Sequence, residues 1–222
     1  MKVISDGQRE LNRKLHQDEK YGNRHDGSGV ATKLPEAITT LNKLGVCRSL
    51  LDYGTGKGKL VKRLRQILDK TVNIDGYDPS VEEWSKLPNK AYDIVTCLDV
   101  LEHVELDTIT NVIDDIKRLT TKFCYVVVDL QPAVKTMEDG RNAHILLAPH
   151  DWWINKFAER FECHIAFPIY HECGLAQKLV IVASDKPSMM PMMFGFLIKI
   201  DIFNLHMGGG ILQTKANKKE NK

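Results

Sequence analysis

Short apolar runs alternate with longer amphipathic segments along most of this 222-residue sequence. The runs with strand character are CRSLLDYG, VNIDGYD, AYDIVTCLDV, FCYVVVDL, CHIAFPIY and KLVIVAS. Segments such as KLVKRLRQIL and LDTITNVIDDIKRL place their aliphatic residues on one helical face. Strands that alternate with helices build an α/β domain around a mostly parallel sheet, because parallel neighbours need a crossover connection. We therefore predict such a sheet, with helices on both faces.

A glycine-rich loop follows the first predicted strand, within LLDYGTGKGKL. Gly54, Gly56 and Gly58 alternate just after Asp52. Glycine lets the backbone approach a ligand closely, and open α/β sheets bind ligands beyond the carboxyl ends of their strands. The position and composition of this loop favour a ligand site over a simple tight turn.

The spacing of the loop excludes two common nucleotide motifs. A dinucleotide fingerprint needs glycine at its sixth position, which is Lys59 when counted from Gly54 and Val61 when counted from Gly56. A phosphate loop needs Ser or Thr where Leu60 follows Lys59. The loop therefore suits a ligand with a ribose and an amino-acid end better than a pyrophosphate, and a dehydrogenase is only the third-ranked interpretation.

Acidic residues stand where such a ligand would need them. Asp52 precedes the loop, where it can face an ammonium group, and Asp78 and Asp99 follow the next two predicted strands. Asp78 lies about 20 residues beyond the loop, the offset of a carboxylate that binds ribose hydroxyls.

Three motifs in this order, LLDYGTGKG, IDGYDPS and YDIVTCLDVLEHV, resemble class I S-adenosylmethionine-dependent methyltransferases. The segment DGRNAHILLAPHDWWINKFAERF resembles the His-…-Trp-Trp region of small bacterial and phage members whose substrates are unassigned. The resemblance covers roughly Tyr21 to Ser184. It implies a Rossmann-like fold and S-adenosylmethionine as the cofactor. The residues that it assigns to the cofactor are Asp52, Gly54, Gly56, Gly58, Asp78 and Asp99.

One part of the resemblance is incomplete. Between Asp78 and Tyr92 the family has a helix, a strand and a turn whose acid contacts adenine, but PSVEEWSKLPNKA has room for one short helix. We expect the third strand of the family fold to be reduced. Trp84 or Leu87 would then contact adenine instead.

The resemblance places Glu102 and His103 at the catalytic face, just after the strand AYDIVTCLDV. We predict His103 as the general base, because a histidine accepts protons near neutral pH; a purely structural histidine remains the alternative. Asp99, Glu102 and His103 also resemble the acid-x-x-Glu-His run that binds a divalent cation in some O-methyltransferases, with His144 or His150 as a further ligand. In those enzymes the first acid of the run is Glu, whereas this sequence has Asp99. We therefore assign no metal ligand here.

The long loop from Gln131 to His150 should lie above the sheet, where Arg141, Asn142 and His144 are candidate substrate contacts. We expect a small-molecule or glycan-like acceptor that is methylated at oxygen or nitrogen. The sequence lacks an amino-methylation motif of the Asn/Asp-Pro-Pro-Tyr type and a Pro-Cys nucleophile. The alternatives are a metal-assisted O-methyltransferase and a module that binds the cofactor without turnover.

We expect three regions: a flexible N-terminal lid over 1–33, with Tyr21 on the cofactor; the methyltransferase domain over 34–185; and a C-terminal extension with a basic tail over 186–222. In the extension, Ile198, Ile200 and Ile202 alternate with polar residues, which is a strand-like period. Such a strand could join the sheet edge, pair two protomers into a homodimer, or touch a membrane surface.

Composition agrees with a cytoplasmic enzyme. The net charge of +2 gives no strong nucleic-acid signal, and the five cysteines form no C-x-x-C pair. The first residues, MKVISDGQRE, contain no apolar segment, and we expect no secretion signal. We also expect no transmembrane segment, since the longest uncharged run is well short of about 20 residues.

Overall fold

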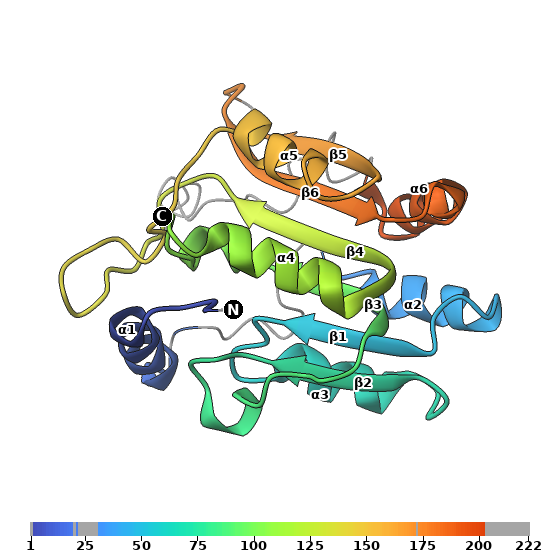
Figure 1. Cartoon of the computed structure of the whole chain (residues 1–222), viewed down its shortest axis with the longest axis horizontal. Helices are drawn as coiled ribbons and strands as arrows, with labels where there is room; N and C mark the ends of the chain where they lie inside the picture. Colours follow the sequence, from blue (N-terminus) through green and yellow to red (C-terminus); the bar gives the residue numbers. More distant parts are fainter. Residues whose placement is uncertain (1, 20, 22–30, 172, 203–222) are drawn as a thin grey trace, which may run out of the picture.

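The computed structural model describes residues 2–19, 21, 31–171 and 173–202. Its centre is a six-stranded sheet with the strand order β2-β1-β3-β4-β6-β5 (Figure 1). The strands are β1 (Ser49–Tyr53), β2 (Asn73–Tyr77), β3 (Tyr92–Leu98), β4 (Thr120–Asp129), β5 (Cys163–Tyr170) and β6 (Ala176–Ser184). All six coincide with the predicted runs.

The first four strands of the sheet are parallel, whereas β6 lies between β4 and β5 and is antiparallel to both. The chain passes from β1 to β2 on one side and then crosses over to β3 on the other. Ligands bind beyond the strand ends at such a reversal of strand order. The fold therefore places a binding crevice between the carboxyl ends of β1 and β3.

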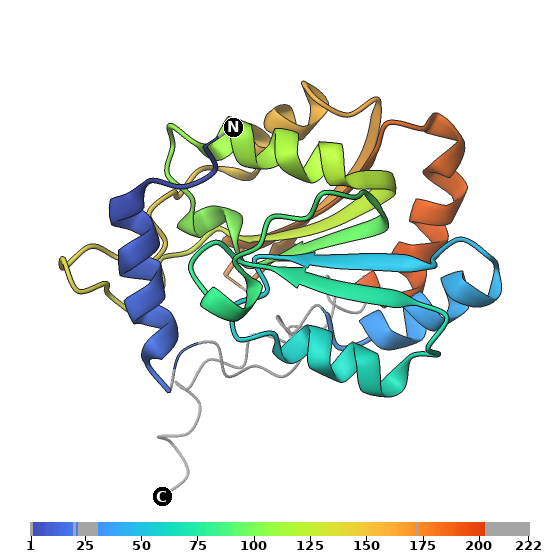
Figure 2. The same ribbon diagram turned by 60° about the horizontal axis from the view of Figure 1, so that its bottom comes forward.

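Helices cover both faces of the sheet, as predicted (Figure 2). Neighbouring residues of one strand point to opposite faces, so Leu50 and Leu51 of β1 enter two separate apolar clusters. One cluster includes residues of α2 (Leu34–Lys43), α3 (Lys59–Ile67) and α6 (Met190–Lys199). The other includes residues of α4 (Ile109–Leu119) and α5 (His150–Ala158).

The segment between β2 and β3 contains no strand, which confirms the expected reduction of the third strand. It holds one short 3₁₀ helix, Glu82–Trp84. The Trp84 ring packs against Gly58 and Gly76, behind the glycine loop. Trp84 and Leu87 are absent from the lining of the cavities described below, so neither is in a position to contact a ligand there.

The expectation of a strand near the C-terminus is wrong, because residues 190–199 form α6. Met193, Phe196, Leu197 and Ile200 are buried at helical spacing, whereas Ile198 is 58% exposed. The alternation of isoleucines at every second position therefore does not describe a buried strand face. Residues 203–222 lie outside the described residues. No helix in the described part of the chain has both the length and the apolarity to cross a membrane.

The predicted N-terminal lid region contains a helix, α1 (Asp6–Gln17), which begins after Ser5. The Ser5 hydroxyl accepts a hydrogen bond of 3.1 Å from the Gln8 backbone N–H, which caps the helix. Figures 1 and 2 show α1 beyond the carboxyl ends of the parallel strands. The segment 22–30, which includes the predicted glycine-rich part of the lid, lies outside the described residues.

Candidate active site

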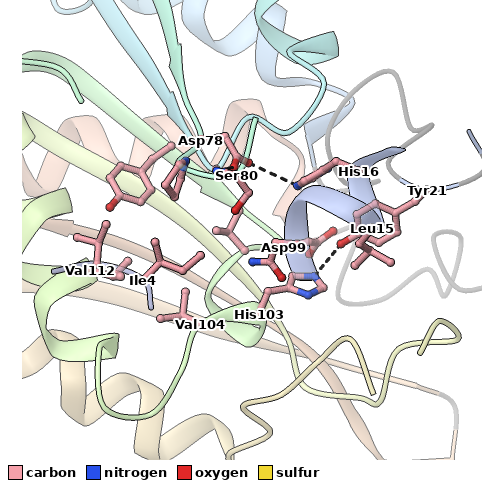
Figure 3. Close-up of a pocket in the computed structure, with 16 residues that line it drawn as sticks. Ile4, Leu15, His16, Tyr21, Asp78, Ser80, Asp99, His103, Val104 and Val112 are labelled. Carbon is pink, nitrogen blue, oxygen red and sulfur yellow. Dashed lines mark hydrogen bonds and ion pairs between the residues drawn. The ribbon is translucent and has the colours of Figure 1, made fainter. Parts of the chain in front are cut away.

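Two adjoining cavities open at the carboxyl ends of the parallel strands. Both are lined by His16, Tyr21, Gly54, Asp99 and His103. The larger cavity has a volume of about 580 Å³, within the range of small-molecule sites. Figure 3 shows the smaller cavity, with α1 side chains facing the strand ends. The site is therefore enclosed between the sheet and the N-terminal helix.

The glycine loop contributes to the lining of the two cavities. Gly54 has φ +78°, and the methyl carbons of Val100 lie 2.4 and 2.5 Å from the place that a Cβ would take. Gly56, with φ +53°, donates its N–H to Asp78 Oδ2 at 3.0 Å. Gly54 and Gly56 line the larger cavity, whereas Gly58 is the N-cap residue of α3 and lines neither.

Asp78 follows β2 and turns back onto the glycine loop. Besides Gly56, it accepts the N–H of Ser80 at 2.9 Å through Oδ1. His16 of α1 covers this carboxylate, with Nε2 3.7 Å from Asp78 Oδ2 (Figure 3). Burial lowers the pKa of His16, against the attraction of Asp78. His16 was not predicted as a site residue.

Asp52 is buried at the base of the larger cavity, at the end of β1. Its Oδ1 accepts the hydroxyl of Thr96 at 2.9 Å. Burial raises the pKa of Asp52 to about 6, and the hydrogen bond from Thr96 opposes this rise. The structure thus places Asp52 beside the loop, as the sequence predicts, and makes its charge sensitive to pH.

A buried lysine joins two acids at the neighbouring strand ends. Lys178 Nζ lies 2.7 Å from Asp99 Oδ1 and 3.0 Å from Asp129 Oδ2, and the lysine side chain is 4% exposed. Burial disfavours the charged form, but Asp99 and Asp129 raise the pKa of Lys178 above its usual value overall. Asp99 adopts a left-handed backbone, φ +54°, which is uncommon outside glycine.

Neither Asp129 nor Lys178 was predicted, although both carried a signal. Asp129 ends a parallel strand, the same position that identified Asp78 and Asp99. Lys178 is a charge within the otherwise apolar run KLVIVAS. A lysine in such a run indicates a buried partner of opposite charge.

Glu102 and His103 follow β3 in the 3₁₀ helix Leu101–His103. Glu102 is fully buried: Oε1 accepts the Asp129 N–H at 3.1 Å, and Oε2 has no partner among the described residues. Burial, reinforced by Asp99, raises the pKa of Glu102 well above its usual value. The surroundings of Glu102 therefore favour its neutral, protonated form.

His103 faces both cavities and has a defined tautomer. Its Nδ1 lies 2.7 Å from the carbonyl oxygen of Ala143, to which it donates, so Nε2 carries the lone pair of the ring. The Tyr21 hydroxyl lies 3.4 Å from that Nε2, and the His144 ring stands edge-on at 4.8 Å. Burial, together with the neighbouring His144, lowers the pKa of His103 to about 4.

The long loop brings one of its three candidate residues into the site. His144 lines the larger cavity, and its Nδ1 is held by the Gln131 carbonyl. Asn142 instead ties the loop together through the backbone of Ala133, and Arg141 pairs with Asp139 and Gln8. Arg141 and Asn142 line neither cavity.

Residues 13–162 match a family model described as a methyltransferase domain. The chain belongs to this family. The match confirms the resemblance found in the sequence and makes the protein a methyltransferase. A comparison with curated proteins finds no match.

Solved structures similar to this methyltransferase share its fold at low sequence identity. The 1,6-didemethyltoxoflavin-N1-methyltransferase of Burkholderia thailandensis, with bound S-adenosylhomocysteine, is 14% identical with a TM-score of 0.54, over 78% of this chain and 86% of that one. The magnesium protoporphyrin IX methyltransferase of Synechocystis PCC 6803, with S-adenosylmethionine bound, is 14% identical with a TM-score of 0.52, over 83% of this chain and all of that one. DhpI in complex with S-adenosylhomocysteine is also 14% identical, with a TM-score of 0.51 over the same shares. They confirm the predicted Rossmann-like fold.

Proposed function

We propose that this methyltransferase transfers a methyl group from S-adenosylmethionine to an oxygen or nitrogen of a small-molecule or glycan-like acceptor. The observation that carries the proposal is the position of Asp78: its carboxylate is turned onto Gly56, beside a cavity that His103 also lines. We expect Asp78 to bind the ribose hydroxyls and His103 to accept a proton, and both side chains line this cavity. The similar structures named above hold this cofactor or its demethylated product.

The cofactor would lie across the glycine loop. Asp78 would bind the ribose hydroxyls, and Asp52 and Asp99 would face the ammonium of the methionine part. The cofactor supplies a methyl group on a sulfonium, whose transfer is accelerated mainly by positioning and exclusion of water. The enclosed cavities, with α1 above them, serve both purposes.

His103 would act on the acceptor. Because its pKa is lowered to about 4, the imidazole is neutral at physiological pH and its Nε2 can accept a proton. The hydrogen bond from Nδ1 to Ala143 fixes the direction of that lone pair. His144 and Asp129 line the same cavity and would contact polar groups of the acceptor.

Titration calorimetry with S-adenosylmethionine, S-adenosylhomocysteine and NAD tests the cofactor. Binding of NAD alone would contradict the proposal. Transfer of a labelled methyl group into a fractionated host extract then separates an enzyme from a module without turnover. We expect Asp78→Ala to weaken cofactor binding severely, and His103→Ala to leave it nearly intact while slowing transfer. Equal losses of affinity in both variants would contradict this division of roles.

A metal-assisted mechanism is the second candidate, favoured by one specific observation. One ligand atom from each of Glu102, His103 and His144 lies within 4.8 Å of the others, and Glu102 Oε2 is buried without a partner in the described structure. Both imidazoles bind a backbone carbonyl through Nδ1, as metal-ligating histidines commonly do. A divalent cation held there would supply Lewis-acid activation of an acceptor hydroxyl.

The two candidates differ in their response to a chelator. If His103 is a base, transfer should be unchanged after dialysis against EDTA. If the cluster holds a metal, transfer should be lost and restored by Mg²⁺ or Mn²⁺, and Mn²⁺ binding followed by electron paramagnetic resonance should disappear in Glu102→Gln. Arg141→Ala, on the same loop but outside the cavities, is the control for both measurements.

A further inference from the structure

The adenine side of the proposed cofactor site is closed by a segment far away in the sequence. If Asp78 binds the ribose, the cofactor extends in two directions from it. The larger cavity, with Asp52 and the glycine loop, suits the charged amino-acid part. The smaller cavity continues past Asp78 along Pro79 and Ser80, and is left for the base.

The smaller cavity has the character of a site for a flat, mostly apolar ring. Val100, Val104, Val112 and Pro79 line it, and Figure 3 shows Val104 and Val112 near Ile4. Trp84, the large ring nearest in sequence, packs behind the loop instead. The remaining wall comes from the N-terminus, where Ile4 and Leu15 are buried.

One face of α1 is turned toward this cavity. Asn12, Leu15 and His16 are three and four residues apart, so they share a side of the helix, and all three line the cavity. Asn12 Oδ1 accepts the side-chain amide of Gln8 at 2.8 Å, and Gln8 is itself 3% exposed. This contact orients the Asn12 amide and occupies one lone pair of Oδ1, which leaves the NH₂ group and the second lone pair of Oδ1 for a ligand.

We propose that α1 is the adenine-binding wall of the cofactor site and that the Asn12 amide recognises the edge of the base. The inference rests on the proposed function. An asparagine amide can donate to a ring nitrogen of adenine and accept from its exocyclic amine at the same time. A base with a carbonyl in place of the exocyclic amine has no donor for the asparagine oxygen, so it cannot form this pair of hydrogen bonds.

Side-chain and backbone contacts hold α1 in this position. The Ser5 N–H donates to Glu105 Oε2 at 2.8 Å, and Asn111 Nδ2 donates to the Lys2 carbonyl at 2.9 Å. At the other end of the helix, Asp18 Oδ2 pairs with Lys135 Nζ at 2.6 Å. A wall fixed at both ends can select a ligand by shape and by hydrogen bonding.

Calorimetry with two ligands tests the proposal: S-adenosylhomocysteine, and S-inosylhomocysteine, in which a carbonyl replaces the exocyclic amine. The full chain should bind the adenosyl compound at least about tenfold more tightly. Asn12→Ala should lose that preference by weakening adenosyl binding about tenfold or more, with little change for the inosyl compound. Arg13→Ala, which alters an exposed residue of the same helix, should behave as the unmodified protein.

The outcomes separate this proposal from the function on which it rests. If the unmodified chain binds neither compound, the cofactor assignment itself fails. If it binds S-adenosylhomocysteine and Asn12→Ala keeps the same preference, the role of Asn12 is wrong. Circular dichroism compares the helix content of each variant with that of the unmodified protein, and so shows whether a loss of affinity arises from an unfolded helix. Leu15→Ala provides a second variant on the same wall, and it should weaken the binding of both ligands alike.

Discussion

At the scale of single residues, the most unusual group is the buried ammonium of Lys178. A lysine is almost never buried without a paired charge. Here two carboxylates, Asp99 and Asp129, surround it, and the buried carboxyl of Glu102 accepts the backbone N–H of Asp129. Lys178 thus keeps two acids of a crowded cluster in fixed positions at the cavity.

We expect Lys178→Met to destabilise the protein by about 3 to 5 kcal/mol, because it leaves two partly buried carboxylates without their cation. Urea unfolding followed by circular dichroism measures the change. Lys14→Met is the matched control, since Lys14 pairs with Glu138 on the surface, and it should give no measurable change. Equal stability of the two variants would show that the buried cluster contributes nothing.

The pKa of His103 makes a prediction about pH. With the pKa at about 4, the imidazole is already unprotonated at pH 5, so the single-turnover rate at saturating cofactor should be flat from pH 5 to 8. An ordinary histidine, with a pKa of about 6.5, would instead make the rate fall roughly tenfold per pH unit below that value. A plateau that ends near pH 6.5 would mean that another group is the base. Rates must be taken at saturation, because protonation of Asp52 near pH 6 can weaken cofactor binding.

At the scale of elements, the turn between β1 and α3 depends on close contact with the segment after β3. Gly54→Ala should cost about 2 to 5 kcal/mol, since alanine is strained at φ +78° and its Cβ overlaps Val100. In a Val100→Ala background the overlap is removed. Gly54→Ala should then cost only about 1 to 2 kcal/mol, which is the cost of the strained backbone alone. Thermal unfolding of the four proteins gives the coupling energy. Additive effects would contradict the proposed contact.

Sequence patterns predicted best the elements whose own residues carry the whole pattern. Strands β3, β4 and β6 each contain a long apolar run that ends at an acidic residue, and both faces of the sheet are covered. The pattern failed for α1, whose apolar face is short because part of it borders the cavity. Its cap was readable as Ser5-x-x-Gln8, a common helix start. The pattern also failed for α6. Isoleucines at every second position indicated a strand, but the segment is a helix whose buried residues have helical spacing.

The site was predictable only where topology alone decides position. Asp78 and Asp99 follow parallel strands, and parallel strands end at one edge, so their proximity followed from the order of the chain. Asn12, His16 and Lys178 reach the same edge from outside the first four strands. Local patterns do not identify the partners in such distant contacts, which depend on how α1 and β6 pack in three dimensions.

At the scale of the whole molecule, cofactor binding should stabilise the fold, since the proposed site joins α1 to the sheet. At a free S-adenosylhomocysteine concentration about 100 times its Kd, linkage predicts about 2.7 kcal/mol of stabilisation. For a chain of this length that corresponds to a rise of roughly 5 to 10 °C in Tm. Differential scanning fluorimetry measures it, and Asp78→Ala should show no rise. An unchanged Tm in the unmodified protein, at a concentration shown to saturate it, would argue against preferential binding to the folded state.

The position of β6 between β4 and β5 affects how the protein must be made. During synthesis β5 is completed before β6. Until residues 176–184 emerge from the ribosome, β5 has no strand to pair with and β4 has an unpaired edge. A polypeptide truncated before residue 176 would contain the entire glycine loop and Asp78. It would nevertheless expose an apolar, unpaired edge of β4 and lack the ammonium of Lys178. Such a fragment is a client for chaperones and proteases, and not a smaller version of the enzyme.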